Sequence, residues 1–220
     1  MKYLKKFNQL NEAVIMPKEI KSDGNLRTID DFKRLGEKEG FDVLDYDEFY
    51  NSLSDKDKKD APPRNNPMAP PFFALFHPIN LKPTLVFSDM MINMHRNPQM
   101  PIPPMLSNHI LDVMRHEFIH KEQGKRAKIE YKLPNPNDRA KYFSDKNEIM
   151  AFSFSIATEI KKSSKSFEEA IDKFENEDLD YNTQMLWDSI INSVSNKIYK
   201  RYTKYIYMYL EKMFEEEKEN

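Results

Sequence analysis

The chain has 220 residues, 39% of them hydrophobic and 12% aromatic, with a formal net charge of −2. This apolar content predicts a folded protein with a buried core, and the near-neutral charge gives no reason to expect nucleic acid or an anionic membrane as a partner. The sequence contains no cysteine and no run of about 18 apolar residues, which excludes disulfides, thiolate metal sites and a predicted transmembrane helix.

Residues 1–20 are expected to form an N-terminal leader or arm ahead of a single domain over residues 21–220. Within the first thirteen residues, the apolar side chains recur at helical spacing, with lysines on the other face, which predicts a short amphipathic helix. One interpretation is a terminal helix packed on the body. The stretch lacks the apolar core of a secretion signal, and the expected location is the cytoplasm of a host cell or a virion.

A second interpretation of the leader comes from the triplet Leu10-Asn11-Glu12, which is followed by Ala13. The segment resembles the capsid-targeting leaders of internal head proteins of large tailed phages, which are cut after a Leu/Ile-x-Glu triplet. The resemblance implies that residues 1–12 are removed. It also implies localisation in a phage head and phage head proteins as partners.

The following segments are predicted to alternate between short helices and a Pro-rich region. Residues 30–35 predict a capped helix that ends near Gly36 or Gly40, and residues 45–50 begin another. Residues 61–104 contain eleven of the fourteen prolines, which excludes a long helix there. The apolar runs 72–76 and 84–87 predict a β-hairpin, and residues 88–104 are expected to form a loop. Strand 84–87 could hold an extended peptide by edge pairing.

Residues 106–126 predict a largely buried helix that carries His116, Glu117 and His120. Ser107 or Asn108 could cap its start. Because residues four apart lie on one helix face, the two imidazoles can converge on one zinc ion, and Glu117 can take a proton from a water at that ion. The alternative is that the histidines are hydrogen-bonded core residues. Zinc at a catalytic site needs a third protein ligand, which the chain should supply.

Glu148 is the candidate third ligand, on a helix expected to start at Ser144 or Asp145 after a connection over residues 127–143. H-E-x-x-H followed by a Glu on a second helix resembles the gluzincin metallopeptidases. The resemblance implies that His116, His120 and Glu148 hold Zn²⁺. The alternative for Glu148 is a capping box with Asp145, which has the required spacing.

The expected function is that of a zinc-dependent metallopeptidase in which Glu117 is the general base and the substrate is a peptide or protein. Tyr131 and Tyr142 are candidates to stabilise the oxyanion. Asp112 could accept a hydrogen bond from a ligand imidazole, although a surface role is equally compatible. The alternative is a non-catalytic zincin-like virion protein. An intact Glu117 favours the enzyme, because a structural zinc site needs no general base.

The predicted fold class is α+β, mainly α. The resemblance implies a zincin-like core that combines an active-site helix, a second ligand-bearing helix and a small β-hairpin or sheet. Further helices are predicted over residues 166–176 and, as one long element, over residues 181–215.

Overall fold

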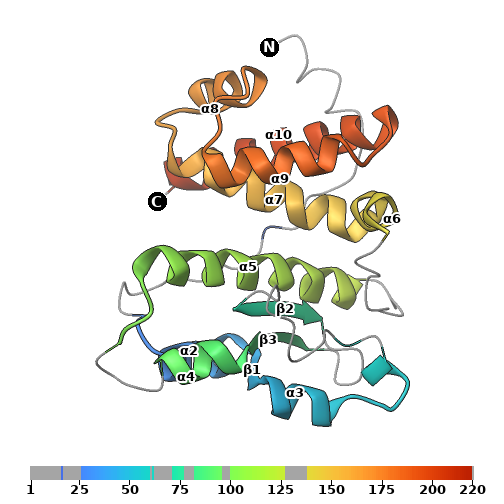
Figure 1. The fold of residues 1–220 in the computed structure, drawn as a ribbon. Helices are drawn as coiled ribbons and strands as arrows, with labels where there is room; N and C mark the ends of the chain where they lie inside the picture. The colour runs from blue at the N-terminus through green and yellow to red at the C-terminus, as the bar shows by residue number, and fades with distance from the viewer. Residues whose placement is uncertain are drawn as a thin grey trace. The chain divides into compact units, whose positions relative to one another are not determined.

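The computed structural model describes residues 16, 26–59, 61, 71–76, 82–95, 100–126 and 138–219. These residues form an α+β structure that is mainly helical and contains one three-stranded mixed sheet, which confirms the predicted fold class (Figure 1). They fall into two compact units, here called the sheet unit (residues 26–126) and the helical unit (residues 138–219). Apart from residue 16, the predicted leader lies outside the described residues, and the single domain over residues 21–220 stays a prediction.

The sheet consists of β1 (Asp42–Asp45), β2 (Phe72–Phe76) and β3 (Pro83–Phe87) in the order β1-β3-β2. β2 and β3 pair antiparallel, which confirms the predicted hairpin, and β1 adds a parallel strand that the sequence did not predict. The expectation that residues 84–87 hold a peptide by edge pairing is wrong. β3 is the central strand, so its backbone groups on both sides are already paired within the sheet.

β3 is buried on both faces of the sheet, which explains its uninterrupted apolar run. Successive strand residues point to opposite faces. Leu85 and Phe87 belong to the larger core, which also includes Met114 of α5 (Pro104–Arg126). Val86 packs in a smaller core on the other face with Phe49 of α3 (Tyr46–Ser52). The larger core lies between the sheet and α5, which contacts β2 and β3 (Figure 1).

Two short helices precede the hairpin, as the sequence predicted. Each starts with a capping box: Thr28 with Asp31 for α2 (Ile29–Glu39), and Asp45 with Glu48 for α3. α2 ends where Gly40 adopts a left-handed conformation with φ of 75°, which glycine accepts at little cost. A 3₁₀ turn, η1 (Asp57–Lys59), follows α3.

The segment between the hairpin and the histidine helix contains a short helix, so the predicted loop over residues 88–104 is wrong in part. α4 spans Asp89–His95. Its first turn is anchored by the hydroxyl of Ser88, which accepts a hydrogen bond from the Met91 amide at 3.3 Å. The prolines of this region are unevenly spread: five of the eleven lie before the hairpin, and none lies within Asp89–His95. The proline content of the whole region was therefore no argument against a short helix at α4.

α2 packs closely on the chain that enters β1, and Gly36 makes this contact possible. A Cβ atom at this position would lie 2.5 Å from Val43 Cγ2 and 3.2 Å from the Phe41 carbonyl oxygen. In Gly36→Ala the gain in helix propensity of about 0.5–1 kcal/mol is smaller than the overpacking cost of about 1–3 kcal/mol. We therefore expect the free energy of unfolding to fall, measured by urea denaturation. An unchanged or higher value would show that the packing of α2 on β1 is described wrongly.

α5 starts three residues before the predicted cap position. Pro104 occupies the first helical position, where its missing N–H is no loss. The prediction that Ser107 or Asn108 caps the helix is therefore wrong, because both lie inside it. The Ser107 hydroxyl instead donates to the Leu26 carbonyl oxygen at 2.7 Å, which ties α5 to the segment before α2.

The helical unit contains α6 (Arg139–Ser144), α7 (Lys146–Lys162), α8 (Phe167–Glu175), α9 (Tyr181–Ile191) and α10 (Asn196–Glu219). Its main contact joins α7 and α10, where the Phe154 and Tyr209 rings meet edge to face with centroids 5.3 Å apart. Asp145 caps α7 as predicted. The connection expected over residues 127–143 is wrong in part. Its last residues, from Arg139 on, belong to the short helix α6, which Asp138 caps.

The single long helix predicted over residues 181–215 is also wrong. α9 ends at Ile191 and α10 begins at Asn196. The interruption is rich in short polar side chains, which compete with the helical hydrogen bonds of the main chain. Ser193 shows this competition, because its hydroxyl donates to the Ser189 carbonyl oxygen at 2.7 Å.

Candidate metal centre

The H-E-x-x-H residues lie in the middle of α5, where the helix is buried on most of its circumference. Ile110 and Met114 are fully buried in the core beneath the helix. The motif itself is also withdrawn from solvent, with exposed fractions of 8% for His116, 6% for Glu117 and 2% for His120. Buried polar groups are costly unless they bind a partner. The motif is therefore a polar cluster that needs a ligand or internal hydrogen bonds.

The two imidazoles converge as a metal ion requires. The Nε2 atoms of His116 and His120 are 3.2 Å apart, and the ring planes are inclined at 78°. Tetrahedral zinc with Zn–N bonds of about 2.0–2.1 Å places two ligand nitrogens roughly 3.3–3.4 Å apart. The observed separation thus fits two ligands of one ion. Each of His116, Glu117 and His120 offers a ligand atom, and these atoms lie within 4.8 Å of one another. The group could therefore bind a metal ion.

The histidine helix is anchored to α2 next to the site. The Lys121 ammonium donates to the Glu39 carbonyl oxygen at 3.1 Å, close to the end of α2, and lies 4.9 Å from the centre of the Phe118 ring. A cation suits a helix C-terminus, where carbonyl groups lack partners in the helix. This contact holds the turn of α5 that carries His120.

Two further polar residues of α5 lie near the motif, and the sequence pointed to only one of them, Asp112. Gln123, which the sequence analysis missed, is 5% exposed and places Oε1 3.0 Å from Nδ1 of His120. Its position three residues after His120 on one helix is the only signal that could have identified it. Asp112 accepts a hydrogen bond from Arg115 at 2.6 Å, an ion pair within one helix turn, and its contact with a ligand imidazole stays a prediction.

Glu148 lies in the helical unit, near the start of α7, and is only 7% exposed. Its predicted alternative role in a capping box is not supported. The Asp145 carboxylate accepts from the Asn147 amide at 2.8 Å, and the Asp145 amide donates to the Tyr142 carbonyl oxygen at 3.1 Å. A capping box would direct that amide to the Glu148 carboxylate. Because the histidines belong to the sheet unit, the role of Glu148 as third ligand stays a prediction.

Within the helical unit, the charge of Glu148 acts on the buried phenol of Tyr202. Tyr202 of α10 is fully buried, and its hydroxyl donates to the Phe143 carbonyl oxygen at 2.9 Å. Burial raises the pKa of the Tyr202 phenol, and the negative charges of Glu148 and Asp145 raise it further. The charge of Glu148 therefore disfavours ionisation of the Tyr202 phenol.

Neither tyrosine proposed to stabilise an oxyanion is among the described residues of the sheet unit, which carries the histidines. Tyr131 lies outside the described residues. Tyr142 is half-buried in the helical unit, where its ring meets that of Phe152 edge to face with centroids 5.7 Å apart. Its catalytic role stays a prediction.

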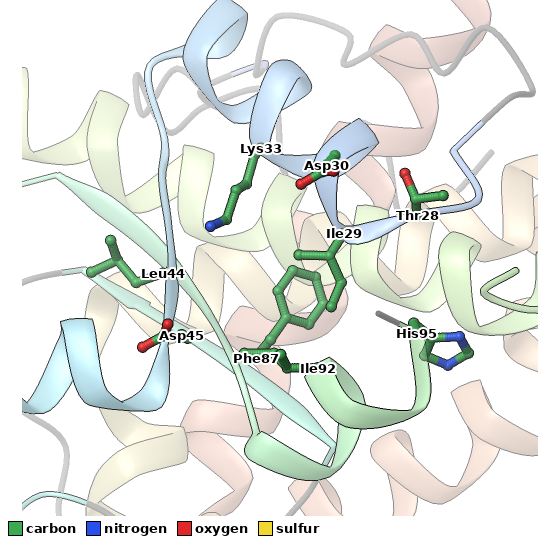
Figure 2. A pocket seen from close by; sticks show the side chains of 9 residues that line it. All are labelled: Thr28, Ile29, Asp30, Lys33, Leu44, Asp45, Phe87, Ile92 and His95. Carbon is green, nitrogen blue, oxygen red and sulfur yellow. The ribbon is translucent and has the colours of Figure 1, made fainter. Parts of the chain in front are cut away.

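A separate cleft of about 270 Å³ lies elsewhere in the sheet unit, between the start of α2, the ends of β1 and β3, and α4 (Figure 2). Its lining mixes charged and apolar side chains, including Lys33, Asp30 and Phe87, and contains none of the H-E-x-x-H residues. His95 at its edge is held by a hydrogen bond between Nδ1 and the Met100 carbonyl oxygen at 2.7 Å. This cleft is therefore distinct from the candidate metal centre.

In comparisons with known proteins, no family model, no curated protein and no solved structure matches the chain. In the described part of the chain, the helices are too short or too polar to cross a membrane.

Proposed function

We propose that this protein is a zinc-dependent metallopeptidase with a zincin-like core. The observation that carries the proposal is the pair of Nε2 atoms of His116 and His120, 3.2 Å apart in a buried site beside the Glu117 carboxylate. Two imidazoles and an adjacent carboxylate on one helix are the combination that a hydrolytic zinc site uses.

Each residue has a distinct role in the proposed reaction. His116 and His120 hold the zinc ion, and Glu148 is the third ligand that the gluzincin resemblance implies. When bound, zinc supplies Lewis acidity, which polarises a carbonyl group and lowers the pKa of a water molecule. Glu117 takes the proton from the attacking water and later delivers it to the leaving amine. Because Glu117 is 6% exposed, its carboxylate works in a medium of low dielectric constant, where electrostatic interactions are strong.

The proposed substrate is an extended peptide or an unfolded protein segment. Among the described strands, β3 is paired on both sides, so only the outer edges of β1 and β2 could pair with a peptide backbone. β2 is the better candidate because it contacts α5, the helix that carries the histidines. Tyr142 and Tyr131 remain the candidates for stabilising the oxyanion.

The proposal is tested by following hydrolysis of an unfolded protein by purified chain, with the products identified by mass spectrometry. We expect cleavage by the zinc-loaded protein, none after treatment with a chelator, and recovery when zinc is restored. Zinc binding without cleavage of any substrate would contradict the enzyme. It would leave the alternative, a non-catalytic zincin-like virion protein, as the better account of the H-E-x-x-H site.

A further inference from the structure

The Gln123 side chain is the polar neighbour of the metal site whose placement needs an explanation. It is 5% exposed on α5, and its Oε1 atom lies 3.0 Å from Nδ1 of His120. A buried amide without a hydrogen-bond partner costs roughly 1–3 kcal/mol. The contact with His120 satisfies part of this requirement and joins the amide directly to a candidate metal ligand.

This contact determines where His120 carries its proton. With the amide oriented so that Oε1 faces the ring, the oxygen can only accept a hydrogen bond, and Nδ1 of His120 is the nitrogen that donates its proton. In the neutral ring the other nitrogen, Nε2, then carries a lone pair and no proton, and it is this atom that lies 3.2 Å from Nε2 of His116. With the opposite amide orientation, Gln123 would donate to Nδ1, and Nε2 would carry a proton where a metal ion must bind.

We infer that Gln123 is a positioning residue of the metal centre: its carboxamide oxygen holds His120 in the tautomer and ring orientation that present Nε2 to the metal ion. The inference rests on the metal-binding part of the proposed function. Metal-bound histidines commonly donate their second N–H to such a partner, and its loss typically weakens metal affinity by about 10- to 100-fold. A neutral amide fixes the ring without adding negative charge to the site.

The test compares zinc affinity in wild type, Gln123→Leu and Gln123→Glu by competition with a chromogenic chelator. Leu fills a similar volume but accepts no hydrogen bond, so we expect affinity to fall by about 10- to 100-fold. Glu restores an acceptor for Nδ1–H, so we expect affinity equal to or above that of the wild type. Unchanged affinity in Gln123→Leu, or an equal loss in both variants, would overturn the inference.

A second measurement does not depend on how well the variants fold. Long-range nitrogen–proton NMR spectra of the zinc-loaded wild type report which nitrogen of each imidazole carries a proton. We expect His120 to be protonated at Nδ1 and metal-bound at Nε2, and the reverse assignment would overturn the inference. Failure of the wild type to bind zinc would overturn the proposed function together with this inference. Zinc binding with the wrong tautomer would overturn the inference alone.

Discussion

Glu117→Gln is expected to bind zinc as tightly as the wild type and to lose peptide hydrolysis. The amide has nearly the volume of the carboxylate but cannot accept the proton of the attacking water. General-base catalysis contributes roughly 100- to 10,000-fold to the rate, so kcat should fall by that factor. The measurements are zinc content after purification and the rate of cleavage of one defined peptide.

A matched control uses Glu122, which lies on the same helix outside the H-E-x-x-H motif. Glu122→Gln makes the same chemical change and should retain both zinc and hydrolysis. Wild-type turnover in Glu117→Gln would remove Glu117 as the base. Loss of zinc in that variant would instead identify the Glu117 carboxylate as a metal ligand, a role that its distance of at most 4.8 Å from the histidine ligand atoms also permits.

His120→Ala is expected to lose both zinc and hydrolysis. This variant removes a metal-bonding nitrogen, so zinc affinity should fall by more than the roughly 10- to 100-fold effect of a supporting residue. It also opens space at a position that is only 2% exposed. Thermal unfolding in the absence of metal should therefore be compared with zinc affinity, since the loss of affinity should exceed any effect of lower stability.

The control for this variant is His109, an exposed histidine on the same helix whose ring contacts that of Phe72, with centroids 5.3 Å apart. His109→Ala removes an imidazole without touching the proposed site, and zinc affinity should be unchanged. If His120→Ala retained full zinc affinity, the metal would be bound elsewhere and the candidate centre would be wrong.

The parts of the fold that the sequence predicted depend on interactions between residues close in the chain. The convergence of His116 and His120 follows from helical spacing alone. The capped starts of α2, α3 and α7 come from side chains that bond to amides two or three residues ahead. The hairpin of β2 and β3 follows from two apolar runs joined by a short connection.

The parts that the sequence missed depend on residues far apart in the chain or on the direction of one side chain. β1 is a four-residue strand whose partner is β3, with Asp42 opposite Thr84, and nothing local indicates that pairing. Gln123 lies three residues after His120, but that spacing alone assigns it no role, and only the direction of its amide toward Nδ1 of His120 does so. The role of Glu148 rests on resemblance, because a ligand contributed by another segment cannot be placed by spacing within one helix.

The most direct test of the metal centre is a crystal of the zinc-loaded protein measured on both sides of the zinc absorption edge. We expect one anomalous peak about 2.0–2.2 Å from Nε2 of both His116 and His120, with an oxygen of Glu148 at a similar distance. A peak bonded to the histidines but not to Glu148 would remove the gluzincin assignment. The absence of zinc between His116 and His120 would contradict the account.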